Sequence, residues 1–187
     1  MPYSALSQQL YYLSLGDEQA FRRVVQQFGD RLYQFARRMV DNPQDAEEIV
    51  SDVFFKIWQL REHLPEYSQF SFYLYRAVKH TALNYQKKQH RKKDAERTFR
   101  IDVNRDFTQN PEEMIISKEN LSNIQQAIDA LPSRCRQIFV LVKEDGLSYR
   151  EVAELLDISP ATVNVQMTLA VKRLWQALDL ALQGSPS

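Results

Sequence analysis

Side chains suited to catalysis are few and scattered in this 187-residue chain. Glu47 and Glu48 fall near the start of a predicted helix, where the helix dipole favours negative charge. No glycine-rich phosphate loop and no nucleophile elbow occurs. The three histidines, His63, His80 and His90, are not spaced from carboxylates or from the cysteine as metal ligands would be. The sequence therefore predicts a protein that is not an enzyme and has no metal site or cofactor.

A different chemistry is indicated where aromatic and basic side chains gather. The net charge of the chain is zero, yet residues 71–105 carry ten basic and three acidic side chains. Rings can stack on unpaired bases while cations hold the phosphate backbone, which indicates single-stranded nucleic acid. The alternative is that Tyr75 and its neighbours are core and the basic run is a solvated helix end. The segment comprises Tyr67, Phe70, Phe72, Tyr73, Tyr75, Arg76, Lys79, Lys87, Lys88, Arg91, Lys92 and Lys93.

The sharpest local pattern starts at Gly146 and predicts a helix-turn-helix. Gly146 suits a left-handed helix end, and Ser148 and Glu151 have the spacing of a capping box. Ser159 then caps a longer helix that has Pro160 in its first turn. Two helices joined by so short a turn form a helix-turn-helix. The alternative is an ordinary helical hairpin with a solvated outer face.

The second helix of this pair has side chains suited to a DNA major groove. Lys172 and Arg173 suit phosphates. The side chains that can offer hydrogen bonds or methyl contacts to base edges are Thr162, Asn164, Val165 and Gln166. The predicted outward face comprises Thr162, Val165, Thr168, Leu169, Lys172 and Arg173. The predicted inward face comprises Val163, Met167, Ala170, Leu174, Ala177 and Leu178.

Amphipathic helices must position these two surfaces. Asn42 and Pro43 suit the cap and first position of one helix, and Pro65 ends that segment. The following helix is expected to end within residues 86–93, where no apolar residue occurs. Apolar residues recur at helical spacing over residues 17–40, 43–60 and 71–88.

Further along the chain, residues 94–110 are polar and aperiodic, which predicts a flexible linker. Asn110 and Pro111 then repeat the earlier cap pattern and open a block whose apolar stripe is Leu121, Ile124, Ile128 and Leu131. With only four glycines and helical spacing throughout, the chain is predicted to be all-α. Two small helical domains are expected, at residues 10–93 and 111–182.

The predicted helix over residues 43–60 has apolar side chains on two faces. Phe55 and Trp58 lie roughly opposite Ile49 and Val53. One interpretation is a helix packed on both sides. The other is a surface for a partner protein, formed by Glu48, Asp52, Phe55 and Trp58.

Three segments together resemble the extracytoplasmic-function (ECF) group of the sigma-70 superfamily. They are residues 45–58 (DAEEIVSDVFFKIW), 70–84 and 131–174. The resemblance covers about residues 10–93 and 111–180, nearly everything except the linker. The last block is also similar to the FecI-like sigma factors common in Bacteroidetes.

The resemblance implies that residues 10–93 are sigma region 2, which binds the clamp of core RNA polymerase and opens the minus-ten promoter element. It implies that residues 111–182 are sigma region 4, which binds the polymerase flap and reads the minus-thirty-five element. The implied polymerase contacts are Asp45, Glu48, Asp52, Phe55 and Trp58. The implied minus-ten contacts are Phe70, Phe72, Tyr73, Arg76, Lys79, His80, Asn84, Lys87 and Lys88. The implied minus-thirty-five contacts are Ser159, Thr162, Asn164, Val165, Gln166, Lys172 and Arg173.

The chain departs from the family pattern at its reading positions. Tyr73 stands where the family often has Trp, and His80 where Asn is frequent. Asn164 and Gln166 stand where many members have Arg. Asp157 replaces a common turn glycine, and aspartate adopts the left-handed conformation more readily than most residues. The resemblance therefore implies promoter DNA as a partner, duplex and melted, without identifying the bases.

Other partners and the compartment follow from family and composition. The resemblance implies an anti-sigma factor that holds the protein inactive. Cys135 is expected to be a half-buried or surface thiol in a reducing cytosol, since a single cysteine forms no internal disulfide. No apolar run of 18 residues and no signal-peptide pattern occurs, which predicts a cytoplasmic protein without membrane insertion. The rival functions are a conventional helix-turn-helix transcription regulator and a helical adaptor that binds only protein.

Overall fold

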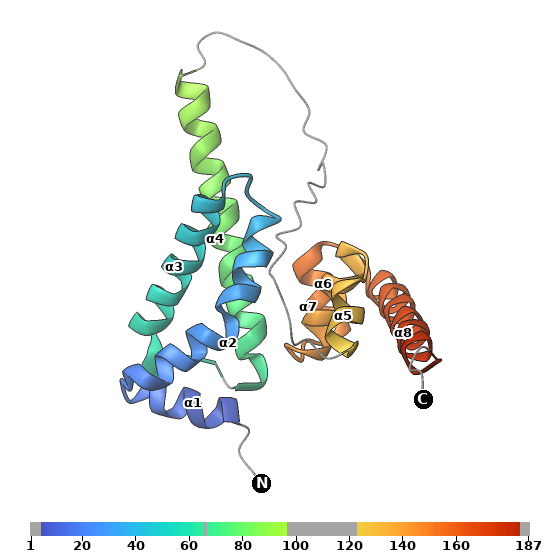
Figure 1. The fold of residues 1–187 in the computed structure, drawn as a ribbon. Helices are drawn as coiled ribbons and strands as arrows, with labels where there is room; N and C mark the ends of the chain where they lie inside the picture. Colours follow the sequence, from blue (N-terminus) through green and yellow to red (C-terminus); the bar gives the residue numbers. More distant parts are fainter. Residues whose placement is uncertain (1–4, 66, 97–122, 184–187) are drawn as a thin grey trace. The chain divides into compact units, whose positions relative to one another are not determined.

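The computed structural model describes residues 5–65, 67–96 and 123–183, and every element in these ranges is a helix (Figure 1). The chain divides into two compact units, Met1–Thr98 and Phe99–Ser187. The first unit holds α1 (Ala5–Ser14), α2 (Glu18–Arg37), α3 (Pro43–Gln59), the 3-10 helix η1 (Arg61–His63) and α4 (Tyr67–Glu96). The second holds α5 (Asn123–Asp129), α6 (Ser133–Lys143), α7 (Tyr149–Leu156) and α8 (Pro160–Gln183). The predicted all-α fold of two helical domains is confirmed.

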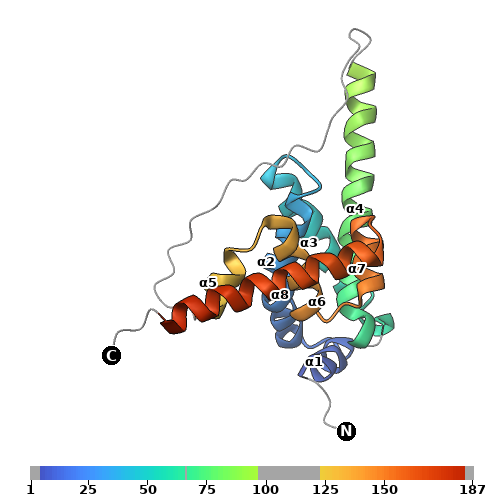
Figure 2. The same cartoon turned by 90° about the vertical axis from the view of Figure 1, so that its right-hand side faces the viewer.

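In the first unit, α2, α3 and α4 pack against one another, and α1 packs against α2, α4 and η1 (Figures 1 and 2). Two edge-to-face ring pairs join α2 to α4: Phe28 with Phe70 at 5.9 Å between ring centres, and Phe35 with Tyr75 at 5.1 Å. The side chains around them that are almost completely removed from solvent include Val24, Leu32, Ile49, Val53, Ile57, Leu74 and Val78.

Both α2 and α3 begin with a side-chain cap, and the cap at Asn42 is the one that the sequence predicts. The Asp17 carboxylate accepts a hydrogen bond from the Gln19 backbone N–H at 2.7 Å. The Asn42 side chain accepts one from the Gln44 N–H at 3.0 Å, and Pro43 occupies the first helical position. Each cap satisfies an N–H that the helix itself leaves without a partner, so both helices begin where the sequence predicts.

The expected end of the third predicted helix within residues 86–93 is wrong, because α4 continues to Glu96. Its last turns extend past the ends of α2 and α3 (Figures 1 and 2). Lys, Arg and Gln favour helix without needing an apolar stripe. Two polar contacts anchor α4 where this stretch begins: the Tyr85 hydroxyl donates to Asp45 Oδ1 at 2.7 Å, and Gln86 Nε2 donates to the Met39 carbonyl.

Some sequence predictions fall outside the described residues. These are most of the linker over 94–110, of which residues 94–96 belong to α4, and the cap at Asn110 and Pro111. The side chains of Tyr67, Arg91, Lys92, Lys93, Leu121, Ile124 and Leu178 are also outside the described part.

The sequence reasoning missed α1. This helix buries Leu10 and Leu13 against the first unit and leaves Tyr11 and Tyr12 exposed. The apolar periodicity of α1 is short, because only two of its apolar side chains face inward. Among all the described helices, none combines the length and apolar composition needed to span a bilayer.

In the second unit, α8 packs against α5, α6 and α7, and its length can be followed in Figure 2. The predicted inward face of α8 is confirmed at Val163, Met167 and Ala170, which are buried. They join a core that includes Leu131, Cys135, Ile138, Leu141, Val152 and Leu155.

The predicted helix-turn-helix is present between α7 and α8. Gly146 has φ +72° and Asp157 has φ +52°, so both adopt the left-handed conformation that ends a helix. Ser148 and Glu151 form the full capping box, in which the Ser148 N–H donates to the Glu151 carboxylate at 2.7 Å. Ser159 Oγ accepts from the Thr162 N–H at 3.1 Å and begins α8.

The left-handed turn at Asp157 gives a stability prediction. Asp157→Gly and Asp157→Ala both remove the carboxylate, but only alanine keeps a Cβ that the φ of +52° disfavours. We expect the glycine variant to be more stable than the alanine variant by about 1 kcal/mol. Urea denaturation of the full chain, followed by circular dichroism, measures the difference. Equal stability of the two variants would contradict a strained backbone at this position.

Candidate nucleic-acid interface

The outer face of α4 brings together several predicted minus-ten residues. Phe70, Leu74, Tyr75, Val78 and Ala82 form its buried inner face. Three- and four-residue intervals place one set of side chains on the opposite face, at positions that are exposed or half-buried. This set is Tyr73, Arg76, His80, Asn84 and Lys87. The face therefore combines an aromatic ring with cations and hydrogen-bonding groups.

A surface pocket of about 460 Å³ lies at the N-terminal part of this face. The Arg76 guanidinium stacks over the Phe72 ring, with 5.5 Å between the guanidinium carbon and the ring centre. A pocket with an aromatic wall and a cation at its edge can hold a planar, polar group. Its lining residues are Pro65, Gln69, Phe72, Tyr73, Arg76, Ala77 and His80.

Three of these lining residues were not found from the sequence. Gln69 and Ala77 lie one helical turn before and after Tyr73, so helical spacing alone could have identified them. Pro65 precedes the helix, and its sequence position predicts only the end of the preceding segment.

Two predicted minus-ten residues lie elsewhere. Phe70 has no exposed surface, and its ring packs against Phe28, so it cannot offer that ring to a base and is removed from the set. Lys88 lies beside Glu48, Tyr85 and Gln89, around a pocket of about 200 Å³ between α3 and α4. Helical spacing separates it from the face that carries Tyr73 and Arg76.

Some predicted polymerase-binding residues of α3 are exposed, and others make contacts within the first unit. Glu48 and Asp52 are exposed, and Phe55 leaves 61% of its surface in solvent. Asp45 instead accepts the hydrogen bond from Tyr85, and that bond raises the pKa of the Tyr85 hydroxyl. Asp45 therefore joins α3 to α4 as well as lying near the exposed acids.

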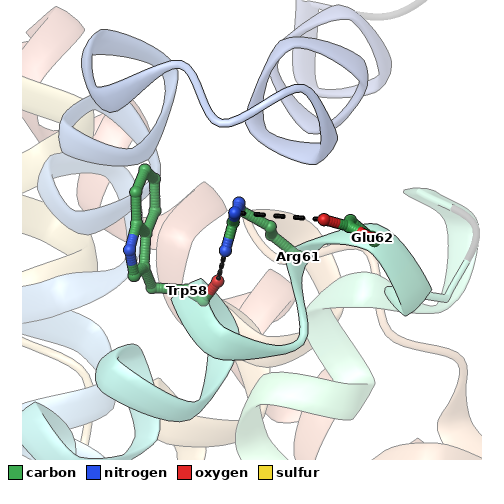
Figure 3. Close-up of polar contacts among 3 residues, drawn as sticks. All are labelled: Trp58, Arg61 and Glu62. Atoms are coloured by element: carbon green, nitrogen blue, oxygen red, sulfur yellow. Dashed lines mark hydrogen bonds and ion pairs between the residues drawn. The ribbon is translucent and has the colours of Figure 1, made fainter.

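Trp58 belongs to a cluster at the end of α3 (Figure 3). Its ring centre is 5.2 Å from that of Phe21 and 4.9 Å from the Arg61 guanidinium carbon. Arg61 also donates to the Trp58 carbonyl at 3.0 Å and lies 3.9 Å from the Glu62 carboxylate (Figure 3). Because Trp58 is half-buried by these contacts, Phe55 is the freely exposed aromatic of the predicted docking set.

The predicted outward face of α8 carries exposed side chains at Val165, Thr168 and Leu169. Lys172 and Arg173 are exposed one turn further on, and Asn164 is exposed beside them. Thr162 and Gln166 are half-buried, and the Ser159 and Thr162 hydroxyls bond to each other at 2.9 Å. The predicted minus-thirty-five residues therefore lie along one helix, with two hydroxyls engaged in its cap.

The expectation of a half-buried or surface thiol is wrong for Cys135, which is 3% exposed. Its Sγ donates to the backbone carbonyl of Gln166 at 3.3 Å and so joins α6 to α8. Burial raises the pKa of this thiol, while the Arg173 charge lowers it by a smaller amount. Its sequence neighbours Arg134 and Arg136 are exposed and half-buried, whereas the thiol faces the inner side of α6.

Each of the two helical units matches a known protein family. The Sigma-70 region 2 family matches residues 24–92, and the Sigma-70, region 4 family matches residues 121–174. The two matches together take in most of the chain, each within one helical unit. The chain therefore belongs to the sigma-70 family.

Full-length relatives place it more narrowly, in the ECF group. It is 29% identical to the ECF RNA polymerase sigma factor SigW of Bacillus subtilis, over 81% of this chain and 85% of SigW. It is 27% identical to the ECF RNA polymerase sigma-E factor of Escherichia coli, over 90% and 89% of the two chains. The sigma factor RpoE of Bartonella quintana, solved with the anti-sigma factor NepR, is 20% identical, with a TM-score of 0.47 over 85% of this chain and 96% of RpoE.

The division of α4 into a core face and an outer face gives the second prediction. We expect Phe70→Ala to lower the free energy of unfolding by about 3–5 kcal/mol, because it leaves a cavity beside Phe28. Tyr73→Ala, only three residues away, is expected to cost less than about 1 kcal/mol because its side chain borders solvent. Urea denaturation of both variants tests this. A similar loss in both would mean that the two rings are not on different faces.

Proposed function

We propose that this protein directs core RNA polymerase to specific promoters and initiates transcription there. The observation that carries the proposal is the presence of sigma-70 regions 2 and 4 in one chain, as two separate helical units. Each unit has a surface suited to a different form of DNA. The outer face of α4 suits unpaired bases, and α8 suits an intact major groove.

We assign the outer face of α4 to the melted minus-ten element. A base turned out of the duplex needs a pocket with a ring to stack on and polar groups at its edge. The pocket around Tyr73 supplies these features, and the half-buried Lys79 and the exposed Lys87 can hold the adjoining backbone. The assigned residues are Phe72, Tyr73, Arg76, Lys79, His80, Asn84 and Lys87.

We assign the exposed surface of α3 to the polymerase clamp. Phe55 offers an apolar centre, and Glu48 and Asp52 surround it with negative charge. An exposed aromatic with charged residues at its rim is the usual composition of a protein interface. Asp45 and Trp58 support this surface by fixing the two ends of α3.

The second unit is assigned to the minus-thirty-five element and the polymerase flap. In a helix-turn-helix, the second helix enters the major groove with its N-terminal residues nearest the bases. We also expect an anti-sigma factor as an inhibitory partner, and we expect the protein to belong to the FecI-like subgroup. Both expectations come from the family resemblance.

In vitro transcription with purified core enzyme on a pool of genomic promoters tests the function. We expect RNA synthesis from a defined subset of templates only when this protein is added. No synthesis from any template would overturn the proposal. A gel shift with and without core enzyme separates the rivals: specific duplex binding by the free protein would favour a conventional regulator. If neutralising Arg76 and Lys87, both exposed on the outer face of α4, leaves activity intact, a protein-binding adaptor is favoured.

The assignment of α3 gives a mutational prediction. Glu48→Lys combined with Asp52→Lys is expected to weaken core-polymerase binding about tenfold, because both reversals fall on the proposed interface. Both side chains are exposed, so the fold should be retained. The matched control is Glu18→Lys with Asp30→Lys, two exposed acids of α2 that change the net charge equally. Unchanged affinity of the α3 variant in a pull-down would remove the docking assignment.

A further inference from the structure

The part of α8 that would enter the groove is uncharged. Residues 160–171 contain no charged side chain, and the first cations are Lys172 and Arg173. Lysine and arginine are the usual readers of guanine, through its O6 and N7 acceptors. The first three turns of α8 therefore lack the side chains that most often recognise a G·C pair.

Three large aliphatic side chains stand exposed in this uncharged stretch, and two of them, Val165 and Leu169, share one face. Val165 leaves 55% of its surface in solvent and Leu169 leaves 43%. Residues four apart on a helix are neighbours on one face, and this face lies away from the buried Val163 and Met167. No helix of the second unit, within its described residues, covers these two side chains.

The major groove offers one apolar group to such a face, the C5-methyl of thymine. Two nearby hydroxyl donors are already used: one in the bond between Ser159 and Thr162, and that of Thr168 in a bond to the Asn164 carbonyl at 2.9 Å. Four residues of helix span about 6 Å along the axis. Successive bases on one strand are about 3.4 Å apart along the duplex. Two thymines within about two base steps of each other would thus match the two side chains.

We propose that Val165 and Leu169 read thymine methyl groups in the minus-thirty-five element and so set the promoter preference of this protein. The inference rests on the proposed function and adds Leu169 as a specificity-determining residue. Recognition is then mainly apolar, with Asn164 as an exposed hydrogen-bonding neighbour and Lys172 and Arg173 left to the phosphates.

The test uses holoenzyme assembled from core polymerase and the full chain, on a promoter that it transcribes. Each thymine upstream of the minus-ten element is replaced in turn by deoxyuridine, which removes only the methyl group. We expect binding to weaken about fourfold at one or two positions, as expected for each methyl group withdrawn from an apolar contact. The DNA change leaves the fold of the protein untouched.

Protein variants test whether Val165 and Leu169 cause the weaker binding to deoxyuridine. In Val165→Ala or Leu169→Ala, deoxyuridine at the corresponding position should no longer weaken binding. The matched control is Val171→Ala, since Val171 is a 39% exposed aliphatic residue on another side of α8 and should leave the deoxyuridine effect unchanged.

The outcomes separate this inference from the proposed function. If holoenzyme transcribes the promoter but deoxyuridine is neutral at every position, or its effect persists in both variants, methyl reading by these residues is wrong and the sigma function stands. If no template is transcribed, the function itself fails. Loss of core binding in Leu169→Ala, with DNA discrimination unchanged, would instead assign the pair to a protein contact.

Discussion

The ring contacts between α2 and α4 are the constraint on which the first unit depends. Phe28 against Phe70 and Phe35 against Tyr75 fix the rotation of α4 about its own axis. Such edge-to-face pairs contribute about 0.5–1.5 kcal/mol each beyond the apolar area that they bury. Because α4 is a single helix, that rotation also decides which aromatic and basic side chains face outward. The core thereby builds the proposed minus-ten surface.

In the second unit, the turns between helices determine how α8 is oriented. A recognition helix is useful only if it leaves the body of the domain at the correct angle, and the left-handed residues Gly146 and Asp157 set the directions of the chain. The capping box at Ser148 and the cap at Ser159 then fix where each helix begins. The Cys135 thiol adds a tertiary contact by joining α6 to the backbone of α8.

Charge and apolar surface are divided between the units in a way that suits two forms of DNA. The outer face of α4 pairs rings with cations, which suits a flexible, unpaired strand. The first turns of α8 carry no charge and expose Val165 and Leu169, which suits a rigid groove where methyl positions differ between bases. Overall charge balance conceals this division, since the acidic side chains lie mainly outside residues 71–105.

Local signals in the sequence determined the fold class, the caps at Asn42, Ser148 and Ser159, and the inward face of α8, because capping and helical periodicity depend on neighbouring residues. Tertiary packing decided the rest. It placed Phe70 in the core, placed Lys88 beside Glu48 and buried Cys135. Whether a ring stacks on a base or on another ring depends on which helix lies across from it, and residues distant in the chain supply that helix.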